Sequence, residues 1–474
     1  MRLLSKPTVE ATIGLSCADG SRRILRLAVA LLLWSLLIPR MSWAEDVDVG
    51  ALVGMEPTRQ SSTSYEAQFA YATVLREPQK LDINVIHKEK WPLSDSTDLV
   101  AIGRLHFDAY DNLEPGKPGQ QEVAPISRRI ILGDHADVEL REFYLKSTIG
   151  DGLIQIGKQQ VVWGNADGLR VLDVVDPFSF REFFLAEFED ARIPRWKVNY
   201  QTPIGSANLQ LLWIPDHSYD DFPDAGSSYA ITSPRYVPQP VPGVTVIQHP
   251  ADHPNRFFAD SDYGLRLSGR VESWDFSTVY LYRYDPIPAF FRTFETTPLG
   301  PAVNVDERYV RSPLIGGTFS NAFGTTVLRG EIGYNFDRYF LTTDLATTEG
   351  VLKTNELDYV LGLDFSHFQH TLISMQMFQS RLADNAPTLL RDRVDTTFTF
   401  LVNRTFQNEK WVAELLWVHD INDSDGLVRP KLSYKGIDNL TVWVGADVFY
   451  GDPIGTFGQF DRQDRVLFGI KWYH

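Results

Sequence analysis

One acidic segment is the first place where this sequence could bind a ligand. Residues 420–426, DINDSDG, resemble a calcium-binding loop because acidic and amide side chains alternate up to a glycine. In an EF-hand loop with Gly426 at the sixth position, the first and twelfth positions would be Ile421 and Leu432. Neither side chain supplies the carboxylate that those positions require. The segment is therefore better explained as a flexible polar outer loop.

Histidines offer two further possibilities. His367 and His370 have a spacing that binds metals on helices, but they lie in a predicted tight turn. His419 and Asp420 end a predicted strand, and proton transfer there would also need a carboxylate pair and a bound water. The sequence carries no nucleophile elbow, phosphate-binding loop or dinucleotide fingerprint. We therefore predict no catalytic residue, no metal site, no cofactor and no enzyme activity.

Composition excludes several other classes of protein. The 474 residues carry a net charge of −16, which argues against a nucleic-acid partner. The single cysteine, Cys17, lies in a predicted leader, which excludes disulfide scaffolds and cysteine-ligated metals from the processed chain. Aromatic residues make up 12% of the chain, too many for a disordered protein.

The N-terminal region has the order of a secretory signal. Basic residues in 22–26 precede the uncharged run 27–38, and small residues stand before a cleavage site after Ala44. The apolar run is shorter than the ~20 residues of a transmembrane helix. We expect a signal peptide over 1–44, with a membrane anchor as the alternative, and then a periplasmic lead-in over 45–64.

The rest of the chain alternates apolar and polar residues with a period of two. In one segment, Leu328 and Ile332 face one way while Arg329 and Glu331 face the other. This pattern predicts strands with one apolar and one polar face. Most of the segments have 8–13 residues, which suits tilted membrane strands of ~9–11 residues. The predicted strands are 65–75, 80–88, 98–110, 137–148, 153–163, 195–202, 207–215, 262–272, 275–284, 308–320, 325–336, 356–366, 371–380, 394–404, 410–420, 427–434, 440–450 and 463–474.

The lengths of the connections provide an independent indication. Short turns join even-numbered strands to the next odd one, and long connections join odd to even. Transmembrane barrels show this asymmetry, with short periplasmic turns and long outer loops. Only helices or closed barrels satisfy every backbone group in lipid. The sequence therefore predicts an all-β transmembrane antiparallel β-barrel of 16–18 strands over 65–474, in the outer membrane. The long connections are 111–136, 164–194, 216–261, 285–307, 337–355 and 381–393.

One block of the sequence adds a family resemblance. From Gly157 to Pro177 the sequence GKQQVVWGNADGLRVLDVVDP resembles a block in porin-like outer-membrane proteins of Gram-negative bacteria, a family of unknown function. More distantly, the architecture is similar to substrate-specific porins and to polysaccharide-export barrels. The resemblance implies an outer-membrane β-barrel and brings no established substrate.

Residues 164–194 interrupt the alternation. Charged residues are mixed there with apolar ones such as Leu172 and Phe183. Exposing so many apolar side chains to water would cost free energy. A barrel of eighteen strands also has an aqueous lumen unless a segment fills it. We expect this segment to fold into the barrel, either as a constriction that selects solutes or as a plug that only braces the wall.

The polar faces of the strands give candidates for a permeation path. Strands three to eleven point mainly basic residues inward. The later strands point acidic residues inward that have no basic partner on the predicted register: Asp358, Asp364, Glu414 and Asp447. Such an arrangement would set an electric field across the lumen; chance distribution is the alternative. The candidate pore-lining or constriction residues are Arg104, Arg170, Asp173, Arg181, Arg266, Arg270, Arg329 and Glu414.

These observations together predict a porin-like channel for passive passage of a small polar or charged solute, with or without selectivity. One alternative is an export component that passes on a polymer or lipid with a periplasmic partner. The other is a barrel enzyme at the outer surface. Expected partners are outer-membrane lipid, lipopolysaccharide and the barrel-assembly machinery. That machinery reads an aromatic terminal residue, where this chain has His474 two residues after Trp472.

Overall fold

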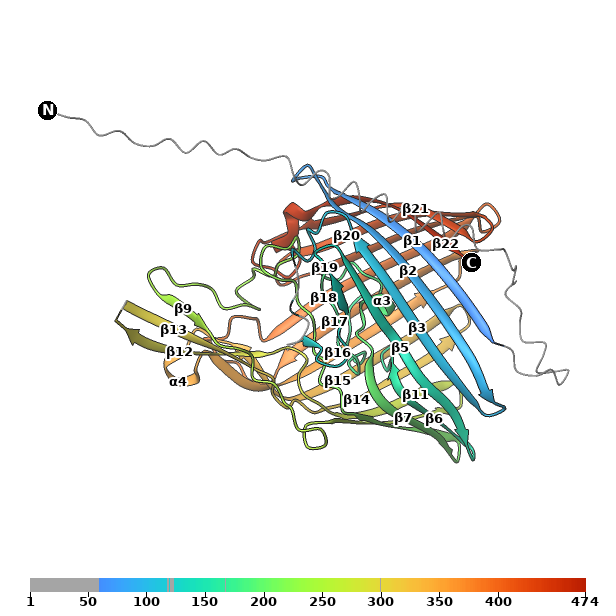
Figure 1. Ribbon diagram of the computed structural model, residues 1–474, viewed down its shortest axis with the longest axis horizontal. Coiled ribbons are helices and arrows are strands. Elements are labelled where there is room, and N and C mark those ends of the chain that lie inside the picture. The colour runs from blue at the N-terminus through green and yellow to red at the C-terminus, as the bar shows by residue number, and fades with distance from the viewer. Residues whose placement is uncertain (1–58, 117–118, 120–122, 167, 299) are drawn as a thin grey trace. The chain divides into compact units, whose positions relative to one another are not determined.

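A closed ring of antiparallel strands dominates the computed structural model (Figure 1). The structure describes residues 59–474 except 117–118, 120–122, 167 and 299. Successive strands pair in chain order, and the ring closes where β1 pairs with β22, with Phe69 opposite Phe468. The predicted signal peptide and most of the predicted lead-in lie outside the described residues. The predicted closed barrel is therefore confirmed.

Eighteen strands of the described chain form this ring, the upper end of the predicted range. In chain order they are β1 (Gln60–Ala72), β2 (Glu77–Ser94), β3 (Thr97–Asp108), β5 (Ala136–Ile149), β6 (Gly152–Gln159), β7 (Arg195–Ile204), β8 (Ala207–Ile214), β10 (Asp262–Val271), β11 (Trp274–Tyr282), β14 (Leu314–Phe323), β15 (Thr326–Leu341), β16 (Val351–Phe365), β17 (Thr371–Leu382), β18 (Val394–Phe406), β19 (Trp411–Asp420), β20 (Asp425–Ile437), β21 (Leu440–Tyr450) and β22 (Arg465–Tyr473).

Every predicted strand overlaps one strand of the ring, with shifts at the ends. β1 begins at Gln60, inside the predicted lead-in, because residues 60–64 pair in register with residues 86–90 of β2. β2 itself extends to Ser94, beyond the predicted end at residue 88. Both strands thus continue through polar residues, beyond the point where the apolar–polar alternation ends. Backbone pairing between strands does not depend on that alternation.

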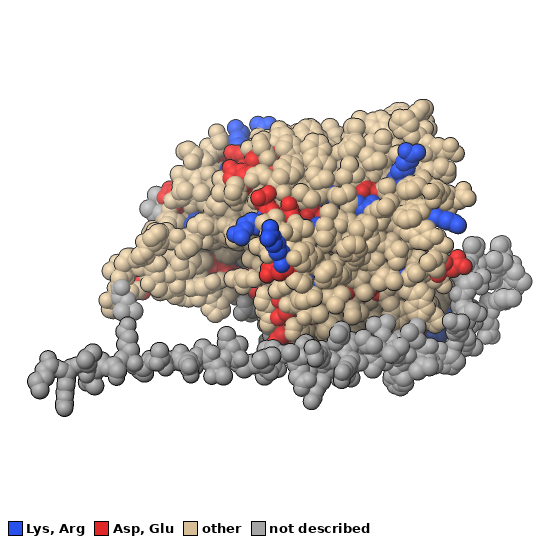
Figure 2. All heavy atoms as spheres, turned by 90° about the horizontal axis from the view of Figure 1, so that it is seen from above, with Lys and Arg blue, Asp and Glu red and all other residues tan. Residues whose placement is uncertain are grey.

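The two faces of the wall have opposite character. On β3, Leu105 is 42% exposed whereas the adjacent His106 is 5% exposed. Figure 2 shows a molecular face made largely of residues other than Lys, Arg, Asp and Glu. Apolar side chains outside and polar side chains inside are the reverse of the distribution in a soluble protein. This distribution is typical of a barrel whose outer surface contacts lipid. Other exposed apolar residues of the wall are Leu145, Leu211, Leu265, Phe276, Ile332, Leu361, Met375, Trp417, Val444 and Phe468.

The connections at one end of the ring are all short, and every long connection lies at the other end, as predicted. The long ones contain β4 (Ile130–Leu132), α3 (Phe188–Ala191), β9 (Thr245–Gln248), β12 (Ala289–Thr297), β13 (Gly300–Arg308), α4 (Leu345–Thr348) and the 3₁₀ helix η2 (Gly458–Gln463). β12, β13 and β9 form a separate three-stranded sheet that projects beyond the ring (Figure 1). Among the described residues, helices are too short or too polar to cross a membrane.

Candidate functional site

The first half of segment 164–194 packs onto the inner wall. Leu172 is wholly buried over Gly316 of β14 and Gly333 of β15, which lie opposite each other. A Cβ atom at Gly316 would lie 2.7 Å from Leu172 Cδ2, and one at Gly333 would lie 3.3 Å from it. The two glycines therefore leave a depression that receives Leu172. Glu331 of β15 also accepts a 3.0 Å hydrogen bond from the Leu172 backbone N–H.

The second half of the segment forms an excursion into the lumen with a closed neck. Phe178 and Arg192 make an antiparallel bridge, and the Ser179 N–H donates to the Ala191 carbonyl at 2.8 Å. Residues 180–190, which we call the excursion, include the start of α3 and lie inside the ring (Figure 1). The prediction that this segment folds into the barrel is thus confirmed.

A buried charge cluster anchors the excursion to the ring closure. The Glu182 carboxylate lies 2.6 Å from Lys80 Nζ of β2 and 2.9 Å from Arg465 Nη1 of β22. Lys80 also pairs with Asp82, and Arg465 with Asp447. Burial raises the pKa of Glu182, but the Lys80 ammonium and the Arg465 guanidinium outweigh burial and hold the pKa at about 2. Glu182 is therefore ionised at neutral pH and links the excursion to both strands that flank β1.

Aromatic packing and a backbone hydrogen bond hold the excursion at the neighbouring wall. The Phe183 ring lies 4.7 Å from Phe460 and 5.7 Å from Phe457, between centroids, in the connection before β22. Arg429 of β20 donates a 2.8 Å hydrogen bond to the Leu185 carbonyl. The excursion therefore contacts the barrel at several places, in addition to the bridge between Phe178 and Arg192 at its base.

A cavity of about 470 Å³ lies between the excursion and the wall formed mainly by β1–β3, β5 and β18–β22. Its described lining contains eleven Lys or Arg and eight Asp or Glu, so positive charge is in excess. A second cavity, of about 320 Å³ and with a more apolar lining, lies beside it. Ala186 and Glu187 line both cavities, so this part of the excursion separates them.

Three of the eight candidate residues line the larger cavity: Arg104, Arg181 and Glu414. Arg104 pairs with Glu139 at 2.9 Å, and Arg181 pairs with Asp82 at 3.3 Å. Both arginines are therefore partly neutralised by the wall. Glu414 accepts a 3.0 Å hydrogen bond from the Asn403 amide.

The other five candidates lie elsewhere. Arg170 stacks on Phe178, with its guanidinium 3.8 Å from the ring centroid, and the Asp173 carboxylate accepts hydrogen bonds from Arg192. Both residues brace the segment itself. On the wall, Arg266 belongs to β10 and Arg329 donates to the Asn165 carbonyl, while Arg270 pairs with Asp275 across a short turn and is 66% exposed.

The predicted separation of a basic wall from an acidic wall is wrong. Asp364 pairs with Arg329 at 2.9 Å, and Asp447 pairs with Arg429 at 2.8 Å and Arg465 at 2.7 Å. The sequence-based count of inward positions missed these pairs because it did not include contacts between neighbouring strands.

Basic residues of β20 are the main part of the site that the sequence analysis missed. Arg429, Lys431 and Lys435 all line the larger cavity together with Glu414 of β19. Their spacing of two and four residues was a usable signal, because it places all three on one face of the strand.

Substituting Leu172 tests how strongly the segment is held on the wall. We expect Leu172→Ala to destabilise the folded barrel by about 2–5 kcal/mol, because a wholly buried leucine leaves a cavity over the two glycines. Urea unfolding in lipid vesicles measures the change. Leu211→Ala is the matched control, since Leu211 is 41% exposed on the outer face. Equal losses in the two variants would contradict this packing.

Two solved outer-membrane protein structures resemble the described barrel. OccAB3 from Acinetobacter baumannii has a TM-score of 0.50 at 8% sequence identity, covering 88% of this chain and 99% of that chain. OccK8 (OprE) from Pseudomonas aeruginosa also has a TM-score of 0.50, at 9% identity, covering 88% and 98% of the two chains. At such low identity these similarities establish the fold alone.

Sequence comparison identifies the family. No curated protein matches the chain in sequence. Residues 133–427 match the family model described as "Protein of unknown function (DUF1302)". The matched region covers more than half of the chain and contains the block from Gly157 to Pro177, so the expected family resemblance is confirmed. The chain therefore belongs to the DUF1302 family of proteins of unknown function, and its closed barrel has the fold of solved outer-membrane porins.

Proposed function

We propose that this protein is a porin-like channel for passive passage of a small polar or charged solute across the outer membrane. The observation that carries the proposal is the charged cavity of about 470 Å³ beside a segment fixed inside a closed barrel. Charged groups around an aqueous path favour hydrated solutes over apolar ones. The apolar exposed face of the wall supports an integral position in the outer membrane, with lipid and lipopolysaccharide as neighbours.

We further propose that the channel prefers anions. The excess of basic side chains around the larger cavity supports this preference. Lys431 is 37% exposed, and within the described part of the chain its one ion pair is a long one of 3.8 Å with the exposed Glu187. Lys435 of the same strand face is exposed as well. These two ammonium groups are placed to attract a hydrated anion.

Recordings from the purified protein in planar bilayers test the proposed channel. The expected result is discrete conductance steps, with a reversal potential in a salt gradient that indicates anion preference. Liposome swelling with neutral, anionic and cationic solutes of equal size then ranks the solute classes. The absence of conductance from correctly folded protein would contradict the proposal.

Neutralising single lysines and arginines tests which charges face the path. We expect Lys431→Gln to lower the anion preference, because it removes a partly exposed charge from the cavity. Arg270→Gln is the matched control and is expected to leave the reversal potential unchanged, since Arg270 lies at a short turn and pairs with Asp275. An equal shift in both variants would show that the cavity does not set selectivity.

The alternative of an export component with a laterally opening wall has less support. β1 and β22 pair without interruption from Ser64 opposite Tyr473 to Ala72 opposite Arg465. A wall that opens sideways for a polymer or lipid would need a weak seam, and this closure is continuous. The proposed channel is therefore one whose path runs along the barrel axis, and we propose no enzymatic activity.

A further inference from the structure

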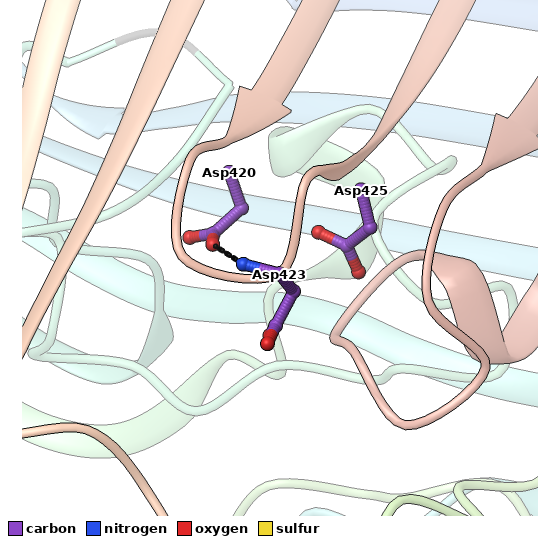
Figure 3. Close-up of side chains that lie close together, drawn as sticks. All are labelled: Asp420, Asp423 and Asp425. Atoms are coloured by element: carbon purple, nitrogen blue, oxygen red, sulfur yellow. Dashed lines mark hydrogen bonds between the residues drawn. The ribbon is translucent and has the colours of Figure 1, made fainter.

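The outer turn between β19 and β20 brings three carboxylates together. Asp420 ends β19, Asp425 begins β20, and Asp423 lies in the turn between them (Figure 3). One carboxylate oxygen from each residue lies within 4.8 Å of the other two. Asp420 is 7% exposed and Asp425 is fully buried. The grouping is therefore not a solvated acidic patch.

Hydrogen bonds account for some of these oxygens and leave others. Asp420 accepts from the Thr397 hydroxyl at 2.9 Å and from the Asp423 backbone N–H at 3.1 Å. Asp425 Oδ2 accepts from the backbone N–H groups of Phe457 and Gly458, at 2.7 and 2.9 Å. Asp425 Oδ1 is buried and accepts no hydrogen bond from the described residues.

Asp423 also has one carboxylate oxygen that accepts a hydrogen bond from the described residues and one that does not. Its Oδ1 accepts a 2.6 Å hydrogen bond from Arg235, while its Oδ2 is buried and accepts none from the described part of the chain. Buried carboxylate oxygens in proteins are normally paired with donors or cations. Three carboxylates against the single guanidinium of Arg235 leave an excess of negative charge. Both the unused oxygens and the charge excess call for a cation.

We propose that Asp420, Asp423 and Asp425 bind one divalent cation, with Ca²⁺ preferred to Mg²⁺. Carboxylate oxygens are the ligands that both hard cations prefer. Two oxygens on opposite sides of Ca²⁺, at about 2.3–2.6 Å each, are separated by up to about 5 Å, whereas Mg²⁺ at about 2.0–2.1 Å demands a tighter, near-octahedral set. The three oxygens all lie within 4.8 Å of one another, close enough to bind one cation, and the flexible coordination of Ca²⁺ tolerates an irregular set of protein oxygens better than the near-octahedral coordination of Mg²⁺.

The position of this cluster gives the cation a structural role. Asp425 receives hydrogen bonds from the start of η2, and Arg235 brings in the connection between β8 and β10. The Ser233 hydroxyl of that connection donates to the Ile454 carbonyl at 2.7 Å. A cation at the three aspartates would thus join three outer connections at one point, independently of whether the barrel conducts solutes.

Calorimetric titration of CaCl₂ into the EDTA-washed full chain in detergent tests the proposal. We expect one Ca²⁺ per chain, and at least tenfold weaker binding in Asp425→Asn. Asparagine keeps an oxygen that can accept from Phe457 and Gly458 and replaces the other oxygen with an amide. Asp464→Asn is the matched control in the β21–β22 connection, because Asp464 accepts from the Phe449 N–H outside the cluster; its Ca²⁺ binding is expected to be unchanged.

The outcomes that overturn the proposal are specific. They are no Ca²⁺ binding by the wild-type chain, equal binding by wild type and Asp425→Asn, or Mg²⁺ binding as tight as Ca²⁺ binding. If Asp425→Asn does not fold, Asp423→Asn decides, because it can retain the acceptor for Arg235 and alters only the unused oxygen. Conductance measured on the same samples keeps this result separate from the proposed channel function.

Discussion

Deleting the excursion and joining Ser179 to Ala191 through two glycines is expected to raise the single-channel conductance several-fold. The Ser179 N–H already donates to the Ala191 carbonyl at 2.8 Å, so a two-residue turn closes the neck without moving the wall. The deletion removes the residues that separate the cavities of about 470 and 320 Å³. A wider path carries more ions at the same voltage.

A matched deletion outside the ring controls for the loss of chain length. Ala289 and Arg308 face each other at the base of the β12–β13 hairpin, so two glycines can also join them. This hairpin projects beyond the ring (Figure 1), and its removal is expected to leave the conductance unchanged. If removing the excursion also left conductance unchanged, the limiting constriction would have to lie elsewhere along the barrel axis.

Glu182→Gln is expected to produce frequent transitions to higher conductance, because the excursion loses its anchor at the ring closure. Removing one partner from a buried ion pair costs about 3–5 kcal/mol when the remaining charges stay buried. Among the described residues, Lys80 would then keep Asp82 as its anionic partner, and Arg465 would keep Asp447. Glu187→Gln is the matched control, since Glu187 is 75% exposed and its ion pair with Lys431 is loose. Identical recordings from the two variants would contradict the anchoring role.

The pH dependence of the wild-type channel tests the same anchor. Although burial raises the pKa of Glu182, ion pairing with Lys80 and Arg465 lowers it from 4.5 to about 2, so the ionised carboxylate stabilises the anchored excursion. Because the pKa is lowered, this stabilisation is complete above about pH 4.5 and is lost as the pH falls towards 2. We expect wild-type recordings to stay steady at pH 4 and to become unsteady near pH 2. Unsteady recordings that begin at pH 4–5 would indicate an ordinary carboxyl group instead.

The strands could be predicted from the sequence because a barrel wall repeats one local rule. Each strand separates lipid from lumen, so apolar and polar residues alternate as they do from Leu328 to Glu331. The inward segment was also predictable, since apolar residues such as Leu172 and Phe183 need a partner surface. Both inferences depend on neighbouring residues along the chain, which a single sequence displays.

The candidate site was less predictable because its contacts join residues distant in sequence. Arg170 has the charge of a pore residue, yet it lies on the ring of Phe178. Arg329 and Asp364 neutralise each other across two strands. For the aspartates at the β19–β20 turn, the sequence-based prediction found no site where the fold brings three carboxylates together. They fail the spacing of a contiguous calcium loop, but two strand ends bring them together.

The pairing of β1 with β22 has a consequence for biogenesis. The strand synthesised first must wait, unpaired on one side, until the strand synthesised last reaches it. Arg465 belongs to that final strand, so Glu182 gains its second cation only at the completing step of assembly. A ribosome that stops before Arg465 would therefore yield a polypeptide that lacks β22, with two open sheet edges and an incompletely secured interior.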